Sequence, residues 1–146
     1  MVASRIARGS AVHQITAPMY MFVDDNQSIY ISDCANHRIM KWRKNSTEGV
    51  IVAGGNGNGS SLNQLNCPKG LFVDRWSQIY VADFWNDRVM RWREGEAEGD
   101  IVVGGNGRGD ALNQFYYPTG LSFDLYGNLY VADSVNVRFL RFDLIL

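Results

Sequence analysis

The sequence predicts an all-β protein built from repeated four-stranded antiparallel units. Three observations lead to this fold class. A set of residues recurs every fifty positions along the 146-residue chain, and no segment has the sustained apolar period of a helix. The chain also holds 15 Gly, 7 Phe, 7 Tyr and 4 Trp, a composition that favours strands joined by tight turns.

The internal period runs through the whole chain without an insertion. Prolines, aspartates and tyrosines recur at a step of fifty residues: Pro18, Pro68 and Pro118; Asp24, Asp74 and Asp124; Tyr30, Tyr80 and Tyr130. We therefore treat residues 1–146 as a single domain of three repeats, at 1–50, 51–100 and 101–146.

The middle repeat gives the expected strands in order. The first strand follows Pro68 and covers residues 71–73, and a turn over 74–78 leads to the second strand at 79–82. A second turn, 83–87, precedes residues 88–93, where apolar and basic side chains alternate as they do in a strand. A polar hairpin, 94–99, returns the chain into a fourth strand at 101–103.

Tandem units of four strands and about 40–50 residues are typical of a β-propeller, in which each sheet is one blade of a ring. A single sheet of this kind leaves two faces uncovered, and stacking the blades around an axis covers both. We therefore predict an all-β propeller of four-stranded antiparallel blades, with three blades in each chain.

One motif resembles a known repeat family. Asn36-His37-Arg38-Ile39 follows a strand that ends in Asp33, and this arrangement resembles the NHL repeat. The second copy departs from it at Asp87 and the third at Val137, where the His would stand, while the neighbouring Asp, Asn and Arg are kept. The resemblance covers essentially the whole chain. It implies a six-bladed ring, of which the chain supplies three blades.

The ends of the chain are offset from the blade boundaries. The first residues align with the fourth strand of a repeat, and the chain ends just after a third strand. Because propellers typically have four to eight blades, we expect two chains to close one ring as a homodimer. The N-terminal strand of each would complete the partner's last blade. The predicted ring-closure residues are Met1, Val2, Ala3, Leu144, Ile145 and Leu146.

Residues that are identical in all three repeats are interpreted as scaffold. Asp and Asn cap tight turns, and Arg can donate several hydrogen bonds to a carboxylate or to carbonyl groups. The predicted structural set is Asp33, Asn36 and Arg38; Asp83, Asn86 and Arg88; and Asp133, Asn136 and Arg138. An acid–base or anion-binding ring is the functional alternative for the same residues.

The predicted function is that of a non-enzymatic scaffold for protein recognition or self-assembly. Large aromatic residues that differ between the repeats are candidate binding anchors, and we select Trp85 and Tyr117 as a binding face for a protein or peptide. Three alternatives stay open. They are a metal-dependent channel enzyme of lyase or lactonase type, RNA binding through one face of the ring, and a half-propeller excised or engineered from a larger protein.

The composition argues against several other classes of function. Fourteen basic and 15 acidic residues argue against binding to nucleic acid by phosphate neutralisation. Cys34 and Cys67 are too few for a disulfide framework and lack zinc-ligand spacing, so we expect no metal and no cofactor. No apolar stretch is long enough for a membrane span, and we expect no membrane partner. The sequence does not indicate a compartment.

Overall fold

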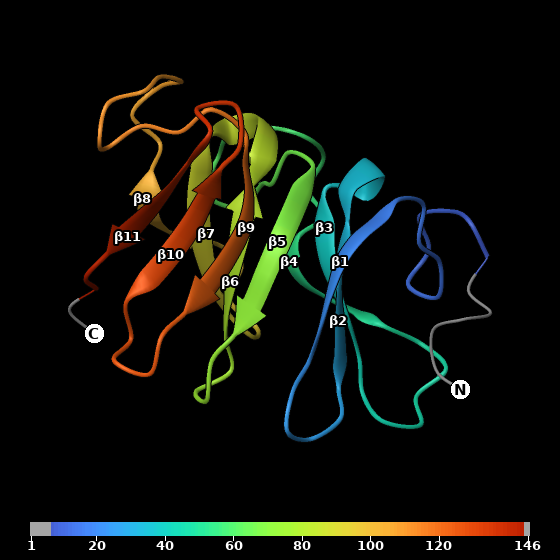
Figure 1. Cartoon of the computed structure of the whole chain (residues 1–146). Helices are drawn as coiled ribbons and strands as arrows, with labels where there is room; N and C mark the ends of the chain where they lie inside the picture. Colours follow the sequence, from blue (N-terminus) through green and yellow to red (C-terminus); the bar gives the residue numbers. More distant parts are fainter. Residues whose placement is uncertain (1–6, 145–146) are drawn as a thin grey trace.

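The computed structural model describes residues 7–144, which form three antiparallel β-sheets standing side by side (Figure 1). We call the sheets blades 1, 2 and 3 in chain order. Each blade takes its first three strands from one repeat, and the fourth strands of blades 1 and 2 cross into the next repeat. Blade 1 contains β1 (Pro18–Val23), β2 (Ile29–Asp33), β3 (Arg38–Trp42) and β4 (Val50–Gly54).

Blades 2 and 3 repeat this order. Blade 2 contains β5 (Pro68–Val73), β6 (Gln78–Asp83), β7 (Arg88–Arg93) and β8 (Asp100–Gly104). Within the described residues, blade 3 has three strands, β9 (Pro118–Phe123), β10 (Leu129–Asp133) and β11 (Arg138–Phe142). The all-β class and the antiparallel blades predicted from the sequence are thus confirmed. In the middle repeat the third strand has the predicted bounds, and the other three strands are longer than predicted by one to three residues at an end.

The two ends of the blades differ in structure. Short 3-10 turns, η1 (Cys34–Asn36) and η2 (Phe84–Asn86), join the second strand to the third at one end, which we call the 3-10 end. The hairpins β1–β2, β5–β6 and β9–β10 lie at the opposite end, at the bottom of Figure 1, which we call the hairpin end. The sequence analysis did not predict the 3-10 turns, because three residues are too few to show a helical period.

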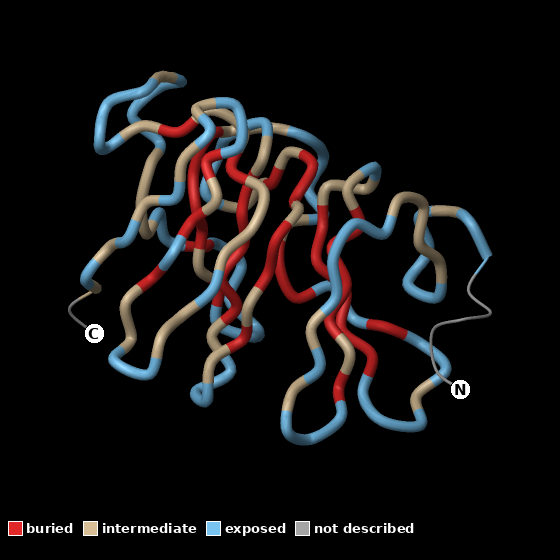
Figure 2. Tube along the Cα trace, viewed as in Figure 1, coloured by how far each residue is buried: buried red, intermediate tan, exposed pale blue. Residues whose placement is uncertain are grey.

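The core lies between neighbouring blades. Figure 2 shows buried backbone concentrated in the strands of blade 2 and in the adjoining strands of blade 1. One apolar cluster joins Tyr30 and Ile39 of blade 1 to Leu71 and Met90 of blade 2. Because each sheet face is apolar, burial of both faces against neighbouring blades supplies the main stabilisation of the fold.

Each connector between blades places one large apolar residue, which we call its plug residue, in the core of the junction. Leu65 lies in the connector from β4 to β5 and is fully buried in the cluster that contains Ile39. Phe115 occupies the same position of the next connector and is fully buried with Val89 of blade 2. Each connector therefore fills the gap between the blade it leaves and the blade it enters.

A disulfide links blades 1 and 2 at the 3-10 end. Cys34 of η1 is bonded to Cys67, the residue before β5, with an S–S distance of 2.06 Å. Fifty residues further on, Phe84 and Tyr117 hold the same two positions, and their rings stack with centroids 4.5 Å apart. One junction is thus closed covalently and the next by aromatic stacking. The sequence analysis missed the pairing because the two cysteines lie in different repeats.

An ion-pair cluster joins the same two blades at the hairpin end. Glu94, after β7, accepts hydrogen bonds from Lys41 at 2.7 Å and from Arg43 at 2.6 Å. The hydrogen bond and charge of Lys41, with that of Arg43, lower the pKa of Glu94 although partial burial works in the opposite direction.

The outermost sheet faces expose apolar side chains. Met21 and Val23 are exposed on blade 1, and Tyr130 and Phe139 are exposed on blade 3. The predicted ring-closure residue Leu144 is partly buried because it packs against the cluster around Phe115 of its own chain. Met1, Val2, Ala3, Ile145 and Leu146 lie outside the described residues.

We expect removal of the disulfide to destabilise the protein. Replacing Cys34 and Cys67 together by Ala releases a cross-link that spans 33 residues, and the chain-entropy model gives a loss of about 3–4 kcal/mol. Urea unfolding of wild type and double variant measures the difference. Dithiothreitol should lower the midpoint of wild type only. Equal midpoints of the two proteins without reductant would contradict a stabilising cross-link.

Glu94 should contribute a pH-dependent part of the stability. Its pKa is lower in the folded state than in the unfolded chain, so its contribution is present above the unfolded value and is lost as the pH falls through the folded value. Glu94→Gln should therefore be less stable than wild type at pH 7, with the difference shrinking towards pH 3. Urea unfolding across that range tests this, with the solvent-exposed Glu98→Gln as a control that shows no such trend.

Candidate functional site

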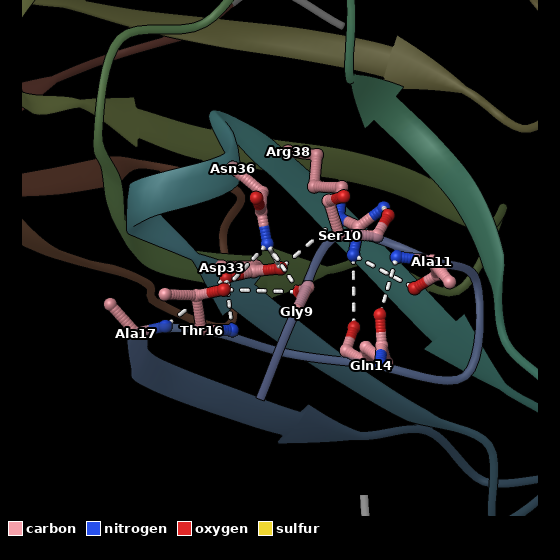
Figure 3. A network of polar contacts seen from close by, with 9 residues as sticks. All are labelled: Gly9, Ser10, Ala11, Gln14, Thr16, Ala17, Asp33, Asn36 and Arg38. Atoms are coloured by element: carbon pink, nitrogen blue, oxygen red, sulfur yellow. Dashed lines mark hydrogen bonds and ion pairs between the residues drawn. The ribbon is translucent and has the colours of Figure 1, made fainter. Parts of the chain in front are cut away.

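The nine residues predicted as scaffold come together as three separate networks, one in each blade. Figure 3 shows the first network, in which Asp33 ends β2, Asn36 lies in η1 and Arg38 begins β3. One carboxylate oxygen of Asp33 accepts hydrogen bonds from Asn36 Nδ2 at 2.7 Å and from Arg38 Nε at 3.1 Å. The other oxygen accepts the backbone N–H groups of Thr16 and Ala17.

The arginine of each network holds the incoming connector. Arg88 donates to Asp83 at 2.8 Å and also to the carbonyl oxygens of Ser60, Ser61 and Gln64. Arg38 and Arg138 make the same set of contacts to residues 10, 11 and 14 and to residues 110, 111 and 114. The network therefore joins two strands and one connector in every blade.

Burial separates the three aspartate carboxylates of these networks from solvent. Asp33, Asp83 and Asp133 have no exposed surface. Burial raises the pKa of Asp83, while hydrogen bonds from Asn66, Asn86 and Arg88 act to lower it. The structure places the predicted scaffold set in structural contacts, and the acid–base alternative finds no solvent-facing carboxylate in it.

The variable position of the Asn-x-Arg motif makes a contact between blades. His37 Nδ1 accepts the backbone N–H of Cys67 at 3.1 Å, and Asp87 Oδ1 accepts that of Tyr117 at 2.9 Å. Both residues have left-handed backbones, with φ of 53° and 49°. His and Asp thus provide the same acceptor, which explains why one replaces the other. Val137 has a φ of 51° and a side chain without an acceptor, and it is 90% exposed.

The two predicted binding-face residues meet at the junction of blades 2 and 3. Trp85 is 47% exposed, and its ring contacts that of Tyr117 edge to face at 5.0 Å. Lys69 lies over the ring of Phe84, and Arg108 lies over the ring of Tyr117 while it pairs with Asp87. The structure brings together an aromatic cluster bordered by two cations at the 3-10 end. The sequence alone did not point to Lys69 or Arg108 as its neighbours.

The innermost strands offer few metal ligands. Met19, Lys69 and Thr119 occupy equivalent positions on β1, β5 and β9. Among residues 7–144, no three His, Cys, Asp or Glu side chains come together as a metal ion would need. Over the same range, no helix has the length and apolar character needed to cross a bilayer.

Comparison with solved structures identifies the fold. A Bacteroides thetaiotaomicron protein of unknown function matches with a TM-score of 0.69 and 17% identity, over 85% of this chain and 34% of its own. An auxiliary nutrient binding protein from Bacteroides ovatus matches with a TM-score of 0.67 and 17% identity, over 86% and 37%. Virginiamycin B lyase from Staphylococcus aureus matches with a TM-score of 0.53 and 11% identity, over 92% and 43%.

These likenesses define the class of protein as a β-propeller, of which the described residues form three blades. The chain spans about a third of the length of the first solved structures that it matches. A scan of protein-family models gives no match, and a search of curated proteins gives none either.

Disrupting one buried network should destabilise the fold. Asp83→Ala leaves the donors of Asn66, Asn86 and Arg88 without their acceptor, and we expect a loss of about 1–3 kcal/mol in the free energy of unfolding. Urea unfolding measures it. Asp25→Ala, at an exposed turn aspartate of blade 1, is the control and should be within about 0.5 kcal/mol of wild type. A wild-type value for Asp83→Ala would refute the structural role.

Proposed function

We propose that this chain is a non-enzymatic half-propeller of NHL type, and that two copies close a six-bladed ring that presents aromatic residues to a protein partner. The observation that carries this proposal is a difference between equivalent positions. Several apolar side chains whose equivalents are buried at the two junctions inside the chain are exposed on its two end faces, although Ile31, Met40 and Trp42 in the middle of the blade 1 face are buried beside Ile15.

The end face of blade 3 supports this most directly. Ile39 and Val89 are fully buried, whereas Phe139 at the same repeat position is 81% exposed. Tyr30 and Tyr80 are also fully buried, while Tyr130 is exposed. Large apolar residues gathered on one open sheet face mark an interaction surface.

The end face of blade 1 has complementary character. Leu71 and Val73 of blade 2 are buried against blade 1, whereas the equivalent Met21 and Val23 are 62% and 50% exposed. If the third junction follows the two that are closed, blade 3 of one copy packs on blade 1 of another. Two such contacts close the ring with two-fold symmetry.

The ion pair between Lys41 and Glu94 at the first junction would have no counterpart where blade 3 of one copy packs on blade 1 of the other. Lys41 meets Glu94 across that junction, whereas Arg141 of one copy would face Lys44 of the other, by the same repeat positions. Apolar burial, and not charge attraction, is therefore the proposed basis of the assembly. Added salt should leave the association intact.

The scaffold role rests on how the repeated polar residues are used. The nine scaffold residues are occupied with one another and with connector carbonyls, so they are not available for chemistry. The exposed Trp85 and the half-buried Tyr117 supply the proposed anchors, because aromatic side chains beside cations are frequent at protein interfaces.

Analytical ultracentrifugation tests the assembly. We expect wild type to sediment at twice the chain mass of 16.4 kDa, and Phe139→Asp to sediment as a monomer. Leu112→Asp changes an equally exposed residue on a connector and should leave the dimer unchanged. A wild-type monomer at all concentrations, or a dimer that ignores Phe139→Asp, would rule out the two-chain ring.

A further inference from the structure

The loop that joins β3 to β4 in blade 1 contains two polar side chains that the fold does not use. Residues 45–47 of this loop read Asn-Ser-Thr and lie at the hairpin end (Figure 1). The pattern Asn-x-Ser/Thr, with x other than Pro, is the acceptor sequence for N-linked glycosylation. We propose that Asn45 is an N-glycosylation site, at which an oligosaccharide is linked to the side-chain amide.

The two side chains that the reaction needs are both accessible. Asn45 and Thr47 are exposed, and neither side chain makes a hydrogen bond to another residue within 7–144. Between them, the hydroxyl of Ser46 is bonded to the backbone of Glu48. The amide of Asn36, by contrast, donates to a buried aspartate. The Asn45 amide is therefore available to react, and the Thr47 hydroxyl is available for recognition by a transferase.

Comparison with blade 2 shows which residues the turn itself needs. The equivalent hairpin of blade 2 closes with the same backbone hydrogen bond, 3.1 Å long against 3.0 Å in blade 1. Asn45 has a φ of 63°, and Gly95 at the same repeat position has a φ of 90°. Asn adopts this left-handed backbone more readily than most residues, so the turn accounts for Asn45. It does not account for Thr47, because blade 2 has Ala97 at that position. Thr47 completes an acceptor sequence without serving the turn.

The disulfide supports the cellular compartment that this reaction requires. Cys34 and Cys67 are the two cysteines of the chain, and they are bonded to each other. Disulfides form and persist in oxidising surroundings, such as the lumen of the endoplasmic reticulum and the extracellular space. Acceptor sequences are used in proteins that follow the same secretory route. The cross-link and the Asn-Ser-Thr sequence are thus two independent observations that favour one route.

Two further triplets of the same pattern are built into the fold. In residues 26–28, Ser28 is only 5% exposed, and its backbone N–H is bonded to the aspartate that caps the turn. In residues 58–60, the backbone carbonyl groups accept hydrogen bonds from Asn86 and Arg88 of the buried network. A transferase has to fit the backbone and the hydroxyl of a triplet into its own site. In the folded protein these two triplets are therefore poor acceptors, and residues 45–47 are the accessible one.

The transfer needs one co-substrate, an oligosaccharide carried on a polyprenyl diphosphate. The amide nitrogen of Asn45 forms a bond to C1 of the first sugar, while the bond from C1 to the diphosphate oxygen breaks. The polyprenyl diphosphate leaves with the electron pair of that bond, and the amide loses one proton to a base of the transferase. No oxidant or reductant takes part in this step.

The position of Asn45 is compatible with a bulky, hydrated group. Its neighbours in the hairpin include Lys44 and Glu48, which are exposed and polar, so a glycan here would cover no apolar surface of the hairpin. The proposed protein-binding residues, Trp85 and Tyr117, lie at the opposite, 3-10 end of the blades. The modification therefore does not depend on the proposed binding role.

Glycan transfer to the folded chain tests the proposal. The full chain with its disulfide formed, made in bacteria without glycans, is incubated with a eukaryotic oligosaccharyltransferase and a lipid-linked oligosaccharide. Peptide-N-glycosidase F in heavy-oxygen water then converts each modified Asn to a labelled Asp, which peptide mass spectrometry locates. We expect label at Asn45 and none above background at Asn26 and Asn58. Short synthetic peptides that contain each triplet outside the fold should all be modified.

Blade 2 provides matched control variants. Asn45→Gly and Thr47→Ala introduce the residues that blade 2 has at these positions, so both should fold as wild type does and lose the label. Thr47→Ser retains a hydroxyl and should retain the label. Urea unfolding confirms that the three variants are folded.

The same chain, secreted from insect cells behind a cleavable leader, should carry a glycan at Asn45. An unlabelled Asn45 in folded wild type, a label that survives Thr47→Ala, or secretion of the disulfide-bonded chain without this glycan would overturn the assignment. None of these outcomes depends on the oligomeric state.

Discussion

The buried aspartate at the end of each second strand is the constraint on which the rest of the structure depends. Its two oxygens accept hydrogen bonds from the turn asparagine, from the arginine of the third strand and from the backbone of the connector that leads into the blade. A fully buried carboxylate is tolerable only with such a set of donors, and the arginine then extends the network to three connector carbonyls. The connector is thereby fixed with its apolar plug, Leu65 or Phe115, between two blades.

Equivalent positions at the two junctions between blades make their contacts with different kinds of side chain. A disulfide closes the 3-10 end between blades 1 and 2, and a stacked aromatic pair closes it between blades 2 and 3. His37 and Asp87 supply the same acceptor to the following blade. The repeated networks hold each blade in place, so the residues at these junction positions can differ from one blade to the next.

Much of the site could be predicted because repetition separates scaffold from variation. The nine scaffold residues were identifiable since Asp, Asn and Arg recur at one step, and their chemistry suits turns and carboxylates. The Cys34–Cys67 bond was not, because its partners belong to different repeat positions and meet only when blades pack.

The sequence by itself determined the number of repeats, the order of the strands and the residues that hold each blade, because these depend on local turn chemistry and on alternation along a strand. Only the tertiary structure decided which faces are covered, since burial depends on the neighbouring blade. Val89 is enclosed and Phe139 is exposed at one and the same repeat position. Their strands are built alike, and the difference comes from the next sheet, which blade 2 has and blade 3 lacks among residues 7–144.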